Sequence, residues 1–131
     1  MSVLVDTHVL LWWIEDRGRL SPAQAEVVEA AGEGTPILVS DISLWEIAML
    51  VHKGRIRLAL PLRAWLERAV APPLVQRVGI SPAVAAEVAA LPESFHGDPA
   101  DRILVATARV FGCTLVTADE RIVASGLVPV L

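Results

Sequence analysis

Cysteine is nearly absent from this sequence, since Cys113 is the only one in 131 residues. A single cysteine excludes a disulfide within the chain, and it does not supply the several thiolates that a structural zinc site needs. A small disulfide-stapled scaffold and a thiolate metal cage are therefore ruled out. We expect Cys113 to be a small buried hydrophobic residue and the protein to occupy the reducing cytoplasm.

Long hydrophobic runs are also missing. No apolar stretch approaches the roughly 20 residues that a membrane-spanning helix requires. The first residues reach an acid, Asp6, before any basic region or small-residue cleavage site of an export signal. We therefore expect no membrane association, no export and a cytoplasmic location.

Positive charge is in deficit, with 11 Lys and Arg against 15 Asp and Glu and a formal net charge of −4. This balance argues against a broad basic surface for nucleic acid, so any polyanion must be held locally. Hydrophobic residues make up 54% of the chain, which is enough to fill a well-packed interior. The length predicts a single domain over residues 1–131.

Short apolar runs alternate with segments of helical character. The predicted strands are residues 2–5, 36–40, 74–78 and 114–117, with 128–131 as a further edge strand. The predicted helices are residues 7–14, 21–31, 41–51, 62–70, 81–91, 98–111 and 119–125. Because parallel strands need helical crossovers, this alternation predicts an α/β fold with a central parallel sheet of four to five strands, covered by helices on both faces.

Capping signals mark where several of these helices begin and end. Ser21 and Gln24 have the spacing of a capping box, and Ser43 and Glu46 have the same spacing in a later helix. Gly112 follows the long helix at the position where a C-terminal glycine is common.

Four acids follow strands or open helices: Asp6, Glu46, Asp101 and Asp119. In open parallel sheets such positions lie at the carboxyl ends of the strands, where ligands bind. Four carboxylates in one cleft repel one another, so the cluster needs a cation or bound protons. Oxygen-only ligands favour Mg²⁺ or Mn²⁺ over zinc, and the three histidines, His8, His52 and His96, lack the spacing of metal ligands.

Each acid also has a purely structural interpretation, because acids are common in the first turn of a helix. Capping alone, however, does not require four acids to converge. Asp98 and Asp101 compete for one place in the cluster. If Asp98 caps the long helix, its oxygens bind backbone amides and Asp101 is free to project into the cleft, so Asp101 is preferred and Asp98 is the alternative ligand.

Four segments carrying these acids, taken together and in order, resemble the motifs of the PIN-domain family, and particularly the VapC-type toxins of bacterial type II toxin–antitoxin pairs. The segments are residues 3–8 (VLVDTH), 43–48 (SLWEIA), 98–102 (DPADR) and 115–119 (LVTAD). The resemblance implies an α/β/α domain that cuts RNA with Mg²⁺ or Mn²⁺ held by Asp6, Glu46, Asp101 and Asp119. It also implies a homodimer and a cognate antitoxin. Thr7 and Thr117 match small hydroxyl residues that hold an acid or lie beside the metal, although turn and capping hydrogen bonds explain them equally well.

The chemistry of phosphodiester hydrolysis fits this set of residues. Carboxylate-held metal ions lower the pKa of a bound water and neutralise phosphate oxygens. We expect Asp6 and Asp101 to hold the principal metal, while Asp119 and Glu46 complete a second site or orient the water. The number of metal ions stays open at this point.

The sequence also offers candidate contacts to RNA and to proteins. The candidate cations for the RNA backbone are Lys53, Arg55, Arg57 and Arg102. Two apolar stretches, residues 9–14 and 44–51, exceed what one buried helix face requires. Trp12, Trp13 and Trp45 within them are candidates for either the core or a protein interface.

Two other functions compete with a ribonuclease. A phosphatase that forms an aspartyl-phosphate at Asp6 would also use an acid at a strand end and Mg²⁺. That reading is disfavoured, because the haloacid-dehalogenase pattern has a second Asp where His8 stands. A non-catalytic interaction module would keep the acids only for stability. The RNA target is left open by the sequence.

Overall fold

Strands and helices alternate along almost the whole chain in the computed structural model, which describes residues 2–95 and 97–131. The elements in order are β1 (Val3–Val5), α1 (Thr7–Glu15), the 3₁₀ turn η1 (Arg17–Arg19), α2 (Pro22–Glu29), β2 (Ile37–Ser40), α3 (Asp41–His52), α4 (Leu62–Ala69), β3 (Val75–Val78), α5 (Pro82–Ala90), α6 (Pro99–Phe111), β4 (Thr114–Val116) and α7 (Glu120–Ser125). The predicted segments therefore correspond closely to the observed ones, with differences of a few residues at their ends.

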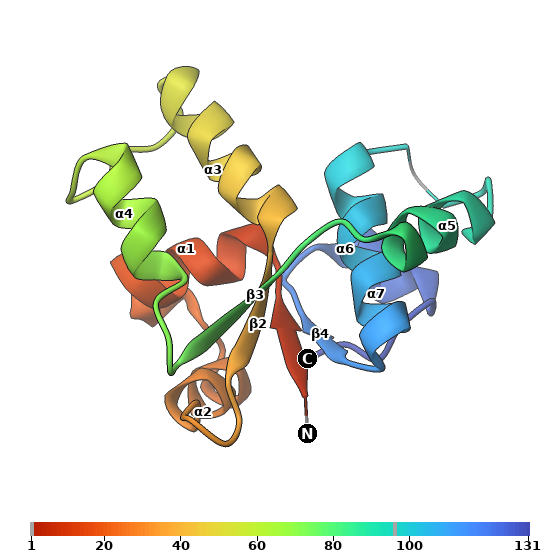
Figure 1. Cartoon of the computed structure of the whole chain (residues 1–131), viewed down its shortest axis with the longest axis horizontal. Helices are drawn as coiled ribbons and strands as arrows, with labels where there is room; N and C mark the ends of the chain where they lie inside the picture. The colour runs from red at the N-terminus through yellow and green to blue at the C-terminus, as the bar shows by residue number, and fades with distance from the viewer. Residues whose placement is uncertain (1, 96) are drawn as a thin grey trace.

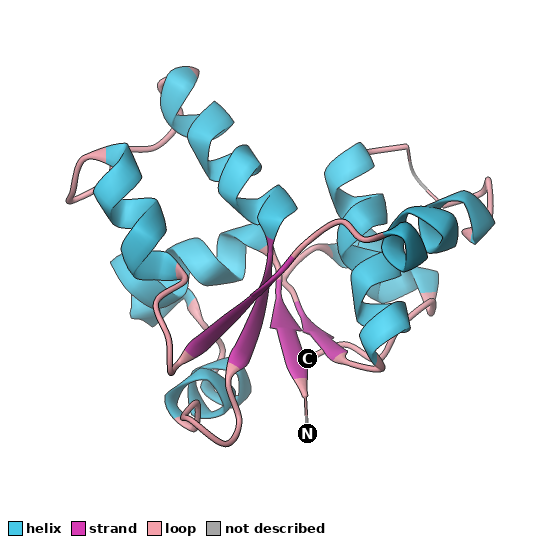
Figure 2. Cartoon of the chain, in the orientation of Figure 1, coloured by secondary structure: helices cyan, strands magenta, loops and turns pink. Residues whose placement is uncertain are grey.

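The strands form one parallel sheet in the order β3-β2-β1-β4 (Figure 2). Leu4 of the central strand β1 pairs with Leu38 on one side and Leu115 on the other. The predicted edge strand at 128–131 is reduced to a single bridge between Leu115 and Val130. Pro129 has no N–H to continue a ladder, so this segment adds no full strand.

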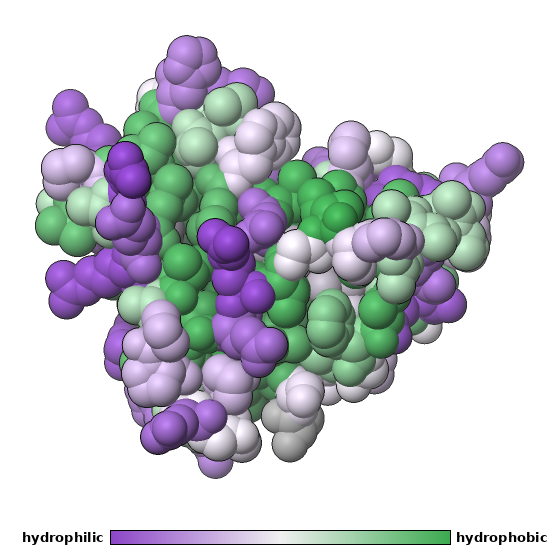
Figure 3. All heavy atoms as spheres, viewed as in Figure 1, coloured by the Kyte–Doolittle hydropathy of each residue, from purple (hydrophilic) through white to green (hydrophobic). Residues whose placement is uncertain are grey.

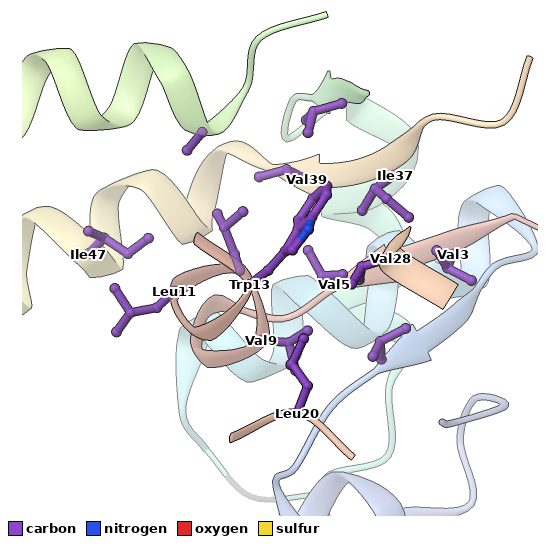
Figure 4. Close-up of a cluster of buried hydrophobic side chains, with 14 of the residues drawn as sticks. Val3, Val5, Val9, Leu11, Trp13, Leu20, Val28, Ile37, Val39 and Ile47 are labelled. Carbon is purple, nitrogen blue, oxygen red and sulfur yellow. The ribbon is translucent and has the colours of Figure 1, made fainter. Parts of the chain in front are cut away.

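Alternate residues of each strand enter two separate cores. Val3 and Val5 of β1 face the cluster shown in Figure 4, together with Trp13 of α1 and Ile47 of α3. Leu4 faces the opposite cluster, which is built mainly by α5, α6 and α7. Figure 1 shows α1 to α4 gathered on one side of the sheet and α5 to α7 on the other. The period of two along buried strands thus produces the predicted three-layer α/β/α arrangement.

Several helices begin where capping residues predict. Ser21 accepts from the Gln24 N–H while the Gln24 side chain accepts from the Ser21 N–H, so the first predicted capping box is confirmed. The second prediction is wrong, because Ser40 caps α3 by accepting from the Ile42 N–H. Strand β2 runs into α3 without a loop, so the helix begins at Asp41 and Ser43 lies within its first turn.

The edge strand β3 differs from the others in being polar at its centre. Its middle residues, Gln76 and Arg77, are exposed between buried Val75 and Val78. Figure 3 shows hydrophilic atoms across this part of the surface with hydrophobic atoms on both sides. A charged side chain at an edge discourages pairing with a further strand. Within the described residues, no helix is both long and apolar enough to cross a membrane.

Candidate functional site

The carboxyl ends of the strands lie between α3 and α6, which rise on either side of that edge of the sheet in Figure 1. Successive strands run from β1 outward through β2 to β3, and the chain then returns to β4 on the opposite side of β1. The order therefore reverses between β1 and β4. A reversal of this kind opens a crevice at the carboxyl ends of the strands, and this is where ligands bind in open α/β sheets.

Asp6 lies at this crevice, directly after β1, and is only 6% exposed. Its Oδ1 caps α1 by accepting from the Val9 N–H at 2.8 Å. Its Oδ2 accepts from the Thr117 hydroxyl at 2.5 Å. Both carboxylate oxygens of a buried acid are thus held by donors from two different elements, which fixes the direction of the side chain.

Glu46 reaches the same crevice from α3 and is half-buried. The Thr7 hydroxyl donates to Glu46 Oε1, and Ser43 Oγ lies 3.0 Å from Thr7 Oγ1. Ser43 is fully buried here instead of capping the helix. Glu46 is therefore positioned by the first turn of α1 through Thr7, and not by a capping box of its own helix.

Asp98 has the capping role that the sequence predicts for it. Asp98 is the N-cap of α6, where its Oδ1 accepts from the N–H groups of Ala100 at 2.9 Å and Asp101 at 3.2 Å. Asp101 lies in the first turn with its side chain 15% exposed. Its Oδ2 lies 3.8 Å from the guanidinium of Arg121.

Asp119 is the N-cap of the short helix α7 and accepts from the Arg121 N–H at 2.8 Å through Oδ1. Its Oδ2 lies 3.6 Å from the guanidinium of the same arginine. The Asp119 N–H donates to the Thr117 hydroxyl at 3.0 Å. Thr117 therefore joins the acid at the end of β1 to the acid that follows β4.

All these acids line one cleft of about 330 Å³. The residues lining it are Asp6, Thr7, His8, Trp12, Glu46, Asp98, Asp101, Leu104, Ala118, Asp119 and Arg121. The predicted convergence of Asp6, Glu46, Asp101 and Asp119 is thus observed, with Asp98 on the same wall. These four acids come from distant parts of the chain and lie in one cleft. Helix capping alone does not require them to lie together.

The cleft raises the pKa of two of its acids. For Asp6 the main cause is burial, which outweighs the hydrogen bonds from Thr117 and Val9, and the charge of Asp101 raises the pKa further. For Glu46 burial is again the largest cause, followed by a lowering by Thr7 and a further rise from the charges of Asp101 and Asp98. In the metal-free protein, neighbouring positive charge therefore does not compensate for the burial of these two carboxylates.

The ligand atoms that this cleft offers are of the type that binds a hard divalent cation. Its ligands would all be carboxylate oxygens, which suits Mg²⁺ or Mn²⁺. Among the described residues, no three His, Cys, Asp or Glu side chains converge closely enough to chelate one ion as they stand. Mg²⁺ commonly binds through one or two carboxylates and keeps several waters. In this structure Arg121 lies between Asp101 and Asp119 and partly neutralises the negative charge of these two acids.

The cations predicted for RNA binding are not part of the cleft wall, which contains none of Lys53, Arg55, Arg57 and Arg102. Arg102 has a structural role, because its guanidinium donates to the carbonyls of Phe95 at 3.1 Å and Val88 at 3.4 Å and lies over the Phe95 ring. The cation that does line the cleft is Arg121. Its position two residues after Asp119 is the only sequence signal that could have indicated it.

Two of the histidines lie in helices: His8 is in α1 and His52 is the last residue of α3. The third, His96, lies outside the described residues. His8 lines the cleft beside Trp12, and the sequence argument did not assign either residue to the site. Of the other tryptophans considered, Trp13 is buried in the core and Trp45 is 57% exposed.

Known proteins support the relationship that the four segments suggest. The profile of the PIN domain matches residues 3–125. Ribonuclease VapC22 of Mycobacterium tuberculosis (strain ATCC 25618 / H37Rv) is 46% identical over 121 residues, which is 92% of this chain and 89% of the relative.

Solved structures share the fold at lower sequence identity. VapBC2 from Rickettsia felis, bound to a DNA fragment from its promoter, has a TM-score of 0.75 at 15% identity and covers 100% of this chain and 98% of that chain. FitAcB from Neisseria gonorrhoeae has a TM-score of 0.67 at 21% identity, covering 98% and 96% of the two chains. The profile match and the 46% identical relative, with a fold that agrees, show that this chain belongs to the PIN domain family.

Proposed function

We propose that this protein is a VapC-type ribonuclease that hydrolyses RNA phosphodiester bonds with Mg²⁺ or Mn²⁺, and that it is the toxin of a toxin–antitoxin pair in the cytoplasm. The observation that carries the proposal is the shared cleft of Asp6, Glu46, Asp101 and Asp119. The name of the 46% identical relative, a ribonuclease, supports the choice of substrate. We further propose that residues 1–131 form one PIN domain.

In this proposal the acids divide the work of holding and orienting. Asp6 and Asp101 hold the principal metal, while Asp119 and Glu46 complete a second site or orient the attacking water. When bound, the metal supplies a water of lowered pKa and neutralises charge on the phosphate. Thr117 and Thr7 keep the carboxylates of Asp6 and Glu46 aimed at the cleft through their hydrogen bonds.

The guanidinium of Arg121 has to move away from Asp101 and Asp119 when a metal ion binds to these acids. Its guanidinium lies near one oxygen of each of Asp101 and Asp119, so it screens the acids that a metal would use. The side chain is 64% exposed, which leaves it room to turn towards solvent or towards a phosphate. Replacing one arginine by a divalent cation gives these acids more positive charge at shorter range.

The partners follow from the same relationship. One solved structure of this fold is a toxin–antitoxin complex from Klebsiella pneumoniae, with a TM-score of 0.66 at 20% identity. We propose a cognate antitoxin and a homodimer for this chain as well. Exposed apolar residues such as Trp45 and Ile14 supply surface for such contacts.

The test is metal-dependent cleavage of a labelled single-stranded RNA by the purified chain. We expect cleavage with Mg²⁺ or Mn²⁺, its loss in EDTA, and its loss in Asp101→Asn, which removes one charge without removing a cap. The matched control is Asp41→Asn, an acid in the first turn of α3 that is not among the residues of the cleft. Cleavage that persists in EDTA would refute the proposal, and activity on a phosphomonoester alone would favour the phosphatase. Full cleavage by a folded Asp101→Asn variant would remove Asp101 from the proposed metal ligands. Unaltered growth arrest in cells producing Asp101→Asn would favour the interaction module.

A further inference from the structure

One wall of the cleft is aromatic instead of acidic. His8 and Trp12 lie one turn apart on α1, and both line the cleft. Their ring centroids are 6.0 Å apart and the rings are tilted by 54°. Trp12 packs partly against the core, whereas His8 is exposed. Trp13, the next residue, is buried in the core and does not line the cleft.

A cation lies over this aromatic wall. The guanidinium carbon of Arg19 is 5.2 Å from the centroid of the Trp12 ring. Arg19 ends the turn η1, whose Arg17 donates from Nε to the carbonyl of Trp13 at 3.1 Å and so ties this turn to α1. Arg19 is exposed, and no carboxylate of the described residues forms an ion pair with it. Its charge is therefore available to a ligand.

The combination has the chemistry that binds a nucleotide. The acidic part of the cleft repels phosphate until a metal is bound, while Arg19 offers a positive charge at its side. Bases that are not paired stack on aromatic rings and on guanidinium planes, and this stacking tolerates different bases. An aromatic residue needed only for packing would gain more by full burial, as Trp13 does.

We propose that His8, Trp12 and Arg19 form a subsite for one nucleotide of single-stranded RNA next to the phosphate that is cut. The base stacks on the parts of the His8 and Trp12 rings that line the cleft, and Arg19, which lies over the Trp12 ring outside the cleft lining, contacts the neighbouring phosphate. The subsite requires an unpaired base, so it selects single strands over duplexes at this position. This inference rests on the proposed ribonuclease function and assigns the substrate contacts of the same cleft.

Binding can be measured by the fluorescence anisotropy of a labelled single-stranded RNA of about 12 nucleotides. All proteins carry Asp101→Asn so that binding is separated from cleavage, and Mg²⁺ is present. We expect Trp12→Leu to weaken binding roughly fivefold or more, as loss of one stacking platform does. Trp12→Phe, which keeps a flat ring, should retain most of the affinity.

Arg19→Gln tests the charge separately and changes only an exposed side chain. We expect weaker binding and a slope of log affinity against log salt that is shallower by about 0.7, which corresponds to one phosphate contact with a single strand. The matched controls are Arg63→Gln, an exposed arginine paired with Glu67 at 3.0 Å, and Phe111→Leu, an exposed aromatic outside the cleft. Both controls should bind as the parent does.

The outcomes separate this inference from the proposed function. If the chain without the Asp101 change cleaves RNA, but Trp12→Leu and Arg19→Gln bind like the controls, the subsite is wrong and the ribonuclease stands. Equal affinity of the parent for a duplex of the same sequence also overturns the subsite. If the parent binds no RNA and the unchanged chain cleaves none, both proposals fail.

Discussion

The hydroxyl of Thr117 donates to the buried carboxylate of Asp6 at 2.5 Å, across 111 positions of sequence. It is a side-chain contact between the segments that follow two neighbouring strands, β1 and β4. The same hydroxyl accepts from the Asp119 N–H, so one threonine sets the relative position of two acids of the cleft.

Thr117→Val preserves the shape of this side chain and removes its donor. We expect a loss of about 1–3 kcal/mol in the free energy of unfolding, because a buried carboxylate oxygen loses its partner. The pKa of Asp6 should also rise further, since the Thr117 hydrogen bond lowers it in the native protein. Urea unfolding in EDTA measures the first effect. The control is Thr107→Val, whose hydroxyl only donates back to the Ile103 carbonyl of its own helix, and equal losses in the two variants would contradict the prediction.

Asp6→Asn should stabilise the metal-free protein in a pH-dependent way. Burial raises the pKa of Asp6, so the folded state holds a proton at pH values where the unfolded chain has already released it. In that window the folded state binds more protons, and the free energy of unfolding falls as the pH rises. Asp6→Asn has no ionisable group at this position, so its free energy of unfolding does not fall for this reason as the pH rises.

Melting curves of the wild-type protein and Asp6→Asn in EDTA test the direction of this pH dependence. We expect the difference in Tm to grow in favour of Asp6→Asn as the pH rises above the ordinary range of an aspartate, by about 4 °C for each 1 kcal/mol in a chain of this length. Mg²⁺ should raise the Tm of the wild-type protein alone. A lower Tm of the variant at every pH would indicate that the cap on Val9 matters more than the charge.

The pair Asp98 and Asp101 can be separated by substitution. Asp98→Asn keeps a good N-cap and should leave both stability and cleavage nearly unchanged, whereas Asp98→Ala should cost about 1 kcal/mol of stability. Asp101→Asn should leave the fold intact and lower cleavage by roughly 10- to 100-fold or more, the scale of damage to a metal site. Cleavage rates and urea midpoints measured on all variants decide between the two acids. The reverse order of activities would make Asp98 the ligand.

Arg121→Gln should tighten metal binding. The arginine lies between Asp101 and Asp119 and competes with a metal for their charge. An ion pair of this exposure contributes at most about 1 kcal/mol, so the dissociation constant for Mn²⁺ should fall about two- to fivefold. Titration calorimetry on the metal-free protein measures it. Arg109→Gln, which breaks the ion pair with Glu87, is the control, and weaker Mn²⁺ binding in Arg121→Gln would make the arginine a support of the site instead of a competitor.

The sheet and the positions of the acids could be predicted from sequence because their signals are local. Apolar runs mark the strands, and caps such as Ser21 and Asp98 mark where helices begin. Parallel strands bring their carboxyl ends to one edge, so acids that follow β1 and β4 meet without any further information. The capping role of Asp98 follows from its spacing to Pro99 in the same way.

The contacts of long side chains could not be predicted from such signals. Arg102 adjoins the acids in sequence but binds backbone carbonyls near Phe95. Arg121 reaches Asp101 only because α6 and α7 pack on the same side of the sheet. The cap of α3 was misplaced because the absence of a loop after β2 leaves no mark in composition, and Ser43 and Ser40 both have the chemistry of a cap.

The position of β4 beside β1 also governs when the cleft comes into being. Residue 6 is translated long before residues 117 and 119, and Asp6 has neither its Thr117 donor nor its Asp119 neighbour until the ribosome has made nearly all of the described chain. For a protein proposed to cut RNA, this delay separates synthesis from activity. A nascent chain of this topology therefore has no complete cleft before Thr117 and Asp119 have been made.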